Sequence, residues 1–251
     1  NNGVCTGITI NTDKKIISEY VVSSLDPSST FESLIGTEYL DPIFITQLKN
    51  IKYRGSVSRV HFELNELPEI KGVSNEEMNT FFTVSPSIEY LERASDACKY
   101  GEISKNPFVE FSFPTINNPE FSSERNHILS ATIQYTPYKL RRNEWSSSLK
   151  ETLKENIISI LSAYIPGINS LIKSTHIFTP VDFEQQFGIK EGSFNHGEMT
   201  LDQFFFMRPT ISTSQYKSPI SNLFICGSST HPGGGIHGAN GYNAAKEILK
   251  A

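Results

Sequence analysis

The stretch from Asn222 to Ala245 reads NLFICGSSTHPGGGIHGANGYNAA. A short apolar segment comes first, a glycine-rich segment follows and small residues end the stretch, so the pattern predicts a strand, a loop and a helix. Glycine-rich backbone and the positive end of a helix dipole together favour a phosphate group or an electron-rich carbonyl. Glycine recurs at every third position from Gly235 to Gly241, which predicts a surface without bulk. Such a surface is typical of close contact with a cofactor or, alternatively, of tight packing between a terminal helix and a sheet.

Within this stretch, Gly233 to Gly238 matches the G-x-G-x-x-G fingerprint of dinucleotide-binding proteins. The fingerprint requires a second strand and an acidic residue about 20 positions further on. The sequence reaches Ala251 only one helix later. The spacing therefore excludes the primary fingerprint and indicates a secondary contact to a cofactor.

Three other segments, 59–64, 109–113 and 129–135, alternate strictly between apolar and polar residues. A period of two is typical of strands with one exposed face. Strict alternation favours an antiparallel sheet that is covered on one side, because parallel strands buried on both faces are apolar throughout.

Two helices are expected to cover this sheet. The first is predicted from Ser85-Pro86 to Gly101, and the second from the capping box at 148–151 to Pro166-Gly167. The predicted fold class is therefore α+β, with a largely antiparallel or mixed sheet covered by helices.

Near the N-terminus, residues 6–10 and 16–24 read as two strands joined by a polar turn, which predicts a hairpin. The Asp26-Pro27 pair ends the second strand. Capping-box spacing at 29–32 then predicts a short helix that ends at Gly36.

The composition limits the classes of function. In 251 residues, 22 Lys and Arg stand against 27 Asp and Glu, a net charge of −5 without a basic run, which disfavours binding to nucleic acid. No apolar run is long enough to span a bilayer. The three cysteines include no C-x-x-C pair, so neither a disulfide framework nor a zinc site is predicted, and the cytoplasm or another reducing compartment fits.

The chain lacks the motifs of two classes of enzyme, because it has neither the G-x-S-x-G of α/β hydrolases nor the Gly-Lys pair of a P-loop.

His196 and Glu198 supply only two metal ligands, so no metal site is predicted, and a role in orienting the loop is favoured over an acid–base pair. Arg208 is expected to pair with a carboxylate, the alternative being a substrate head group. For His231, a hydrogen bond that stabilises a turn and a role in proton transfer both stay open.

Two long segments resemble a known family. Residues 222–235 are similar to the C-terminal flavin-contact motif of phytoene dehydrogenase-like FAD-dependent oxidoreductases. Residues 194–209, FNHGEMTLDQFFFMRP, are similar to the segment that precedes this motif in the branch of pyridine nucleotide-disulphide oxidoreductase domain-containing protein 2. Shorter similarities at 22–27, 91–97 and 179–184 extend the resemblance along nearly the whole chain.

The resemblance implies that the chain is the C-terminal portion of a longer enzyme with a split FAD-binding α/β domain. Residues 1–26 would be the last strands of that domain, 27–215 an inserted substrate-binding domain, and 216–251 the terminal FAD contact. The main pyrophosphate site would lie in an N-terminal half that partners this chain. Alone, this portion is expected to bind FAD weakly or not at all and to be inactive.

By the same resemblance, Gly227 lets the strand end approach the cofactor, the loop lies along the ribityl chain and the flavin ring, and amides near Gly238 face the pyrimidine carbonyl. Catalytic residues are not assigned, because the flavin itself accepts the hydride in such enzymes. The residues expected to contact the cofactor are Gly227, Ser228, Ser229, His231, Pro232, Gly233, Gly234, Gly235, Ile236, His237 and Gly238.

The implied activity is removal of hydride from a hydrophobic substrate, held in a cavity lined by apolar side chains of the 27–215 sheet. A hydrophobic substrate is also compatible with peripheral membrane contact. The alternative is a non-catalytic module that binds a lipid or isoprenoid, or that docks onto another protein.

Overall fold

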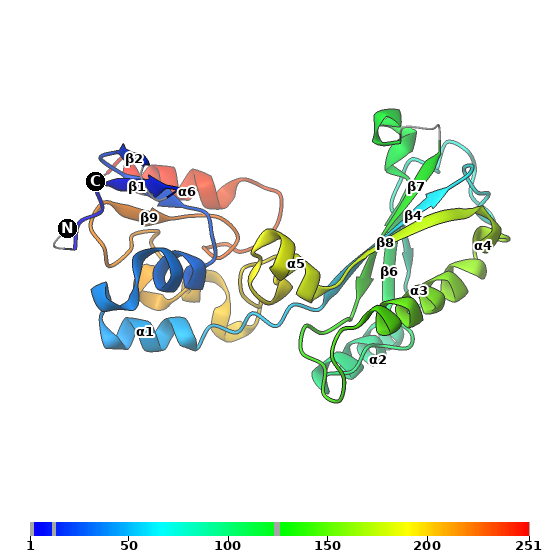
Figure 1. Cartoon of the computed structure of the whole chain (residues 1–251), viewed down its shortest axis with the longest axis horizontal. Coiled ribbons are helices and arrows are strands. Elements are labelled where there is room, and N and C mark those ends of the chain that lie inside the picture. The colour runs from blue at the N-terminus through cyan, green and yellow to red at the C-terminus, as the bar shows by residue number, and fades with distance from the viewer. Residues whose placement is uncertain (1–2, 12–13, 123–125, 251) are drawn as a thin grey trace. The chain divides into compact units, whose positions relative to one another are not determined.

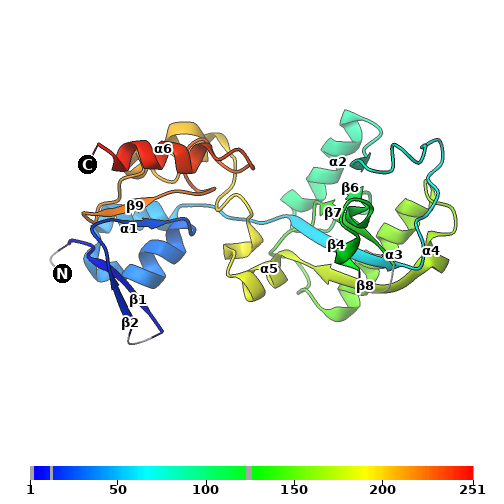
Figure 2. The same ribbon diagram turned by 90° about the horizontal axis from the view of Figure 1, so that it is seen from above.

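The computed structural model describes residues 3–11, 14–122 and 126–250. The chain forms two compact units, which can be followed in Figures 1 and 2. Unit 1 consists of Asn1–Arg54 and Gly188–Ala251, and unit 2 consists of Gly55–Phe187.

These units do not coincide with the functional segments expected from the sequence. Residues 27–54 and 188–215 fold with the two terminal segments rather than with the sheet of unit 2. The roles expected for 1–26, 27–215 and 216–251 stay predictions.

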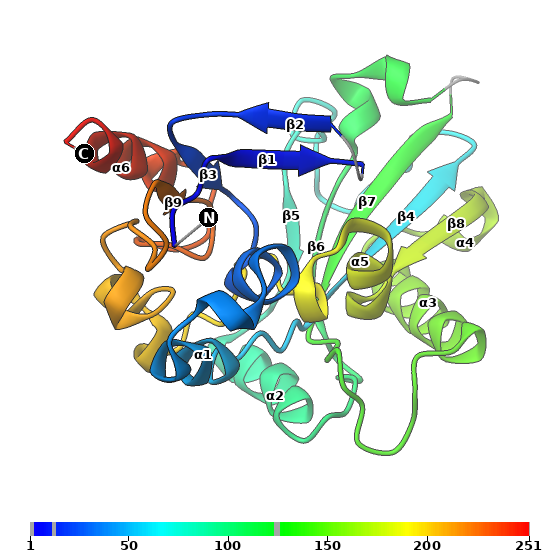
Figure 3. The same cartoon turned by 60° about the vertical axis from the view of Figure 1, so that its left-hand side comes forward.

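Unit 1 contains a hairpin and a parallel pair of strands. β1 (Gly7–Ile10) and β2 (Lys14–Ile17) pair antiparallel, which confirms the hairpin, with turn residues 12 and 13 outside the described residues. β3 (Val21–Ser23) pairs in parallel with β9 (Leu223–Ile225), as Figure 3 shows. The single strand predicted over 16–24 is therefore wrong. The Ser18 hydroxyl donates to the carbonyl oxygen of Tyr20 (2.7 Å) where the backbone bends, so the two halves of the segment join different strand pairs.

Short helices follow β3: η1 (Ser29–Ile35), which is a π-helix, η2 (Thr37–Tyr39) and α1 (Pro42–Lys49). The Asp26 carboxylate accepts a hydrogen bond from the amide of Ser29 at 3.0 Å. The capping box predicted at 29–32 is wrong, because the Ser29 hydroxyl donates to Asp26 and Glu32 accepts from Ser28 instead. The predicted end at Gly36 is confirmed.

An apolar core holds α1 against the β3–β9 pair and so fixes the position of the strand ends. The rings of Phe31 and Phe44 meet edge to face with centroids 4.9 Å apart. The buried apolar residues of this core are Phe31, Leu40, Phe44, Leu48, Ile220, Leu223 and Ile225.

Unit 2 is built on a five-stranded sheet. The strand order is β5 (Phe82–Val84), β6 (Phe108–Ser112), β7 (His127–Gln134), β4 (Val57–Leu64) and β8 (Ile172–Phe178), and each neighbouring pair is antiparallel. Figure 3 shows the strands in this order. The predicted antiparallel sheet is confirmed, and with its covering helices so is the α+β class.

Two helices, α2 (Ile88–Lys99) and α3 (Ser147–Ser162), cover the sheet as predicted. Their caps differ from the prediction: Ser87, not Ser85, accepts from the amide of Tyr90 (3.1 Å), and Ser146, not Ser148, accepts from the amide of Leu149 (3.3 Å). α3 also ends before Pro166. Serines one or two positions apart are equivalent in a sequence pattern, and only the backbone geometry selects the one that caps.

The apolar residues of the alternating strands lie beneath α3 and form the main core. Val60, Phe62, Leu129 and Ile133 are completely buried there, as is Ile157 of α3. These side chains are therefore part of the core, and the hydrophobic cavity expected between apolar side chains of 27–215 stays a prediction.

The remaining elements are short. They are η3 (Pro114–Ile116), η4 (Pro119–Phe121), α4 (Ile168–Leu171), α5 (Pro180–Phe187), η5 (Lys190–Gly192), η6 (Leu201–Gln203), η7 (Phe205–Met207), η8 (Ile211–Thr213) and α6 (Ala239–Ile248).

Candidate cofactor-contact site

The glycine loop joins β9 to α6 in unit 1, and its first glycine lies where the parallel strands end. The amide of Cys226 donates to the carbonyl oxygen of Ser23 at 2.8 Å. Gly227 has φ +82°, and a Cβ there would lie 2.8 Å from the carbonyl oxygen of Ser24. Glycine is therefore required by the close approach of the two strand ends. A contact between Gly227 and a cofactor stays a prediction.

The next part of the loop is held by hydrogen bonds from two polar residues. The Thr230 hydroxyl donates to the carbonyl oxygen of Gly227 at 2.8 Å. From the first turn of α6, the Asn240 amide group donates to the carbonyl oxygens of Thr230 (2.9 Å) and Gly233 (3.1 Å). Both polar side chains are buried. The loop is thus fixed by its own helix before any ligand is considered.

Arg208 ties the loop to the second segment that the sequence singled out, residues 194–209. Its side chain is 2% exposed. The guanidinium donates to the carbonyl oxygens of Ser228 (3.0 Å), Glu198 (2.8 Å) and Gln203 (2.9 Å), and also to those of Asn195 and Gly197. The expected pairing with a carboxylate is wrong, because backbone carbonyls occupy the guanidinium. Burial lowers the pKa of Arg208 to about 10, so the group still carries its charge at pH 7.

The central glycines also face this segment. A Cβ on Gly233 would lie 2.6 Å from the Met199 methyl carbon, and one on Gly234 would lie 1.8 Å from Oδ1 of Asn195. These two glycines therefore make room for residues 195–199. The two motifs found separately in the sequence form one contiguous structure.

The last four residues of the loop, Gly235 to Gly238, are exposed. The side chain of Ile236 is fully open to solvent. His237 accepts a hydrogen bond from the amide of Ala239, the first residue of α6, through Nδ1 (3.1 Å). A Cβ on Gly238 would meet no atom within 4 Å. These four residues, the rim, are exposed at the positive end of a helix dipole, an arrangement that favours an electron-rich group, and their contact with a cofactor stays a prediction.

The expected stripe of small residues is only partly present. Gly235 lies in the loop and Gly238 caps the helix, so only Gly241 and the two alanines that follow lie within α6. Ala244 is buried, whereas Gly241 is exposed with open space around it.

Buried polar atoms without a hydrogen-bond partner also concentrate here. In the described ranges they are Nδ1 of His196, Oγ1 of Thr200, Nε of Arg208, Oγ of Ser229 and Nδ1 of His231. Each belongs to one of the two contacting motifs. Buried polar groups in native proteins are generally satisfied by protein, ordered water or ligand. Ordered water or a ligand is therefore expected to meet these atoms.

The Glu198 carboxylate pairs with Arg54 rather than with His196, and the Glu198 carbonyl oxygen accepts from Arg208. Within the part of the chain that the structure describes, no group of three or more His, Cys, Asp and Glu could hold a metal ion. Burial lowers the pKa of His196, with Asp26 opposing and Arg208 adding to that shift. The role favoured for both residues, orientation of the loop, stays a prediction.

A hollow of about 510 Å³ opens beside His231, with Phe205, Tyr216 and Lys246 among its lining. The Tyr216 hydroxyl donates to the carbonyl oxygen of His231 at 2.8 Å. The turn is therefore stabilised through the backbone of His231, while its ring lies at the hollow. Proton transfer by this ring stays a prediction.

A buried polar cluster lies at the other strand end, after β3. Asp26 accepts from the hydroxyl of Tyr53 at 3.2 Å, and the ammonium of Lys190 lies 5.3 Å from the centre of the Tyr53 ring. Burial, and then the charge of Asp26, raise the pKa of Tyr53 far above its usual value. The strand ends therefore carry fixed charges of both signs.

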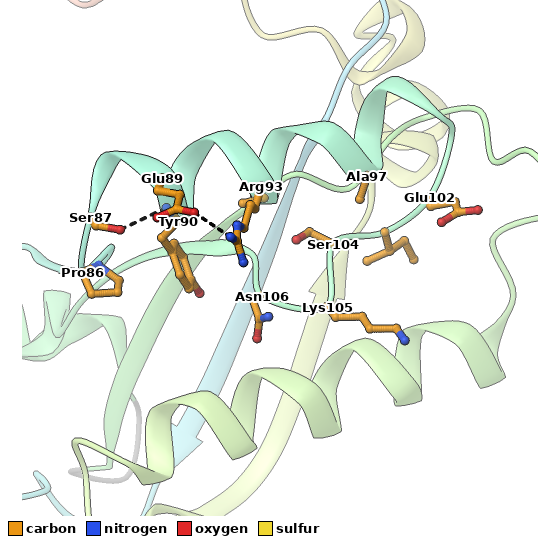
Figure 4. Close-up of a pocket in the computed structure, with 12 residues that line it drawn as sticks. Pro86, Ser87, Glu89, Tyr90, Arg93, Ala97, Glu102, Ser104, Lys105 and Asn106 are labelled. Atoms are coloured by element: carbon orange, nitrogen blue, oxygen red, sulfur yellow. Dashed lines mark hydrogen bonds and ion pairs between the residues drawn. The ribbon is translucent and has the colours of Figure 1, made fainter.

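Unit 2 has a hollow of its own, of about 500 Å³, beside α2 (Figure 4). Arg93 at its wall is paired with Glu89 at 2.6 Å. Glu102 and Lys105 add one charge of each sign. This lining favours neither anions nor cations, and we assign it no function.

Three features of the site were not predicted from the sequence: the burial of Arg208, the loop contacts of Asn240, and the packing of Asn195 and Met199 on the central glycines. Asn240 lies just after the glycine-rich loop, in the first turn of α6. An Asn near a predicted helix start was the only sign in the sequence of its contacts. Arg208 had no such signal, because a buried arginine reads like an exposed one in a sequence.

Comparison with known proteins agrees with the resemblance found in the motifs. The chain is 29% identical over its whole length to pyridine nucleotide-disulfide oxidoreductase domain-containing protein 2 of Mus musculus, covering 45% of that protein. It is 26% identical over 99% of its length to a limonene dehydrogenase chain of Castellaniella defragrans, covering 48%, and 24% identical over 94% to a lycopene-forming phytoene desaturase of Paracoccus sp., covering 45%. The predicted resemblance is confirmed. The chain is similar in sequence to these proteins and spans about half the length of the curated relatives it matches.

The fold has a counterpart among solved structures. An oxidoreductase from Methanosarcina mazei superposes on the whole chain with a TM-score of 0.56 at 13% identity, over 47% of its own length. This likeness concerns the fold alone. No family model matches the chain.

Among the described residues, no helix is both long and apolar enough to cross a membrane.

Proposed function

We propose that the chain is the substrate-binding and flavin-contacting portion of an FAD-dependent oxidoreductase, with the rim Gly235 to Gly238 directed at the flavin. The proposal is supported by sequence similarity to oxidoreductases along the whole chain. It is also supported by the exposure of the four rim residues just before the start of α6.

The residues of the chain fit such a cofactor in a specific way. Arg208, Asn240 and Thr230 hold the loop through carbonyl oxygens, which leaves its exposed amides for the ligand. The charge of Arg208 and the dipole of α6 favour an electron-rich group near the loop. When bound, the flavin would supply the hydride acceptor. The contribution of the chain would be to bind, to orient and to exclude water.

The proposed reaction is removal of hydride from a substrate held by unit 2. The sequence predicts a hydrophobic substrate, and the names of two relatives, limonene dehydrogenase and phytoene desaturase, agree with that prediction, whereas the polar face of the sheet in unit 2 favours a polar substrate, as argued below. The main pyrophosphate site is proposed to lie in an N-terminal half, which is the principal partner of this chain.

The exposed rim gives a direct test. In the chain alone, the side chain of Ile236 is fully open to solvent, so Ile236→Asp should change the free energy of unfolding by less than about 0.5 kcal/mol. In the full-length protein, the same change should weaken FAD binding about tenfold, since it places a carboxylate where an electron-rich group of the flavin is expected. Titration of the apoprotein with FAD, followed by flavin fluorescence, measures this.

Thr230→Val is the matched control. It removes a hydroxyl that already donates to Gly227, so it should cost about 1 kcal/mol of stability while leaving the FAD affinity of the folded protein nearly unchanged. Equal FAD affinity in Ile236→Asp and the parent would contradict the contact between the rim and the flavin. A full-length protein that is colourless and cannot be reconstituted with FAD would contradict the function itself.

A further inference from the structure

The face of the five-stranded sheet that α3 does not cover is polar. Its side chains form rows across the strands, and every one of them is partly or wholly exposed. One row runs Phe178, Arg59, Thr132, Glu110 and Thr83; the next runs His176, His61, Ser130 and Ser112; a third runs Ser174, Glu63 and Ile128; and a fourth, on the other side of the first, runs Val57, Gln134 and Phe108. Polar and charged side chains outnumber apolar ones on this face, in contrast to the apolar core on the other side.

A hydrocarbon seated on this face would separate the polar groups from water without offering hydrogen bonds in return. The hydroxyls of Ser130 and Thr132 and the imidazole of His61 lie near the middle of the face, where a ligand would cover them first. Burying such groups without partners opposes binding. The face therefore selects a ligand that can form hydrogen bonds.

The charges on the face are arranged unevenly. The carboxylate of Glu63 accepts from Asn126 (2.6 Å) and Ser174 (2.8 Å) and lies 4.0 Å from the ammonium of Lys173, so the charge of Glu63 is already compensated. Arg59 is exposed and, over the ranges that the structure describes, has no carboxylate within ion-pair distance. Glu110 lies in the same row as Arg59, with Thr132 between them.

Two histidines reinforce the positive end. His61 and His176 lie opposite each other on β4 and β8, directly beside Arg59. Burial lowers the pKa of His61, and the charges of Arg59 and His176 lower it further. Three groups that carry or can take a positive charge thus repel one another at one place, and an anion placed among them would relieve that repulsion.

Aromatic rings border the same place. Phe178 lies opposite Arg59, with its ring centre 4.4 Å from that of His176 and 5.5 Å from that of Phe183 on α5. Planar groups can stack against such rings, while the guanidinium binds a carboxylate through two parallel hydrogen bonds.

We propose that the substrate of this protein is a small polar molecule carrying a carboxylate on a planar or unsaturated body, bound on the uncovered sheet face with Arg59 as its anchor and Phe178 beside it. That the ligand is the substrate rests on the proposed function, whereas binding itself does not. This substrate class differs from the hydrocarbons named for two of the relatives.

The test uses the whole chain and three ring compounds of similar size. Benzoate supplies the planar carboxylate, benzyl alcohol a neutral polar group, and toluene a hydrocarbon. Binding is followed by NMR through the ring protons of the histidines, with those of His61 and His176 assigned by substitution. We expect benzoate to shift both signals, benzyl alcohol to bind about tenfold more weakly, and toluene to leave them unchanged.

Arg59→Gln should weaken benzoate binding about tenfold. The matched control is Arg93→Gln, an equal loss of charge on α2, which should leave the benzoate affinity unchanged. Toluene binding as strong as benzoate binding, equal affinities in the two variants, or no shift with millimolar benzoate would each overturn the proposal. Because no flavin is present in this experiment, its failure leaves the FAD titration as an independent test of the proposed function.

Discussion

The glycine loop has two regions that look alike in sequence and differ in structure. From Gly227 to Gly234, a Cβ added to any of the glycines would collide with a strand end or with residues 195–199. From Gly235 to Gly238, the backbone is exposed. A run of glycines thus serves two purposes in one loop: the first region needs glycine to pack the protein against itself, and the second leaves its backbone accessible to a ligand.

Removing the buried charge should break the packed region most severely. Arg208→Gln leaves several buried carbonyl oxygens without their donor, so we expect a loss of about 4 kcal/mol in the free energy of unfolding. Urea denaturation of the chain measures this. Arg93→Gln, in an exposed pair, should cost less than about 0.5 kcal/mol. A small loss in Arg208→Gln would show that the guanidinium does not hold the loop.

Adding a methyl group should have opposite effects on stability at a packed glycine and at an open one. Gly227→Ala places a Cβ 2.8 Å from a backbone oxygen at φ +82°, which should cost about 3 kcal/mol. Gly241→Ala, in α6 with open space around it, should instead stabilise the chain by about 1 kcal/mol. Thermal unfolding of both variants checks the signs. If both variants destabilise the chain alike, the distinction between packed and open glycines fails.

The smallest effect concerns the pH dependence of the packed region. Because burial lowers the pKa of His196 in the folded chain, the unfolded chain binds a proton first as the pH falls below about 6.5. Stability due to this residue is therefore complete above that pH and is lost as the pH falls toward the lower, folded pKa. His196→Asn, which tolerates the positive φ of +50°, should lose less stability than the parent between pH 7 and pH 5.5.

Urea denaturation at a series of pH values provides the comparison. Parallel pH profiles for the parent and His196→Asn would contradict the burial of an uncharged imidazole.

Much of the fold was accessible from the sequence because it depends on local patterns. The alternation at 59–64 and 129–135 predicted antiparallel strands, since a period of two places each side chain on a fixed face. The apolar spacing in the helix near Ile157 predicted its buried side for the same reason. The single strand predicted at 16–24 is wrong because the chain bends after Ser18, where the Ser18 hydroxyl bonds to the backbone. Residue type alone does not specify this contact.

The site was only partly accessible. The exposed rim near Gly238 followed from the glycine pattern and the helix that succeeds it. The packed glycines did not, because their neighbours, such as Asn195, lie some 40 positions away in sequence. The polar face around Arg59 was visible in the alternation, whereas the hydrophobic cavity was implied only by the family resemblance.

The division of the chain has a consequence for how the molecule forms. Unit 2 is one continuous segment, Gly55–Phe187, whereas unit 1 is assembled from the two ends of the chain. The parallel pairing of β3 with β9 joins residues about 200 positions apart, and closing so long a loop is slow. We therefore expect the inserted sheet to fold early and to bring the chain ends within reach of each other, so that the glycine loop acquires its geometry last.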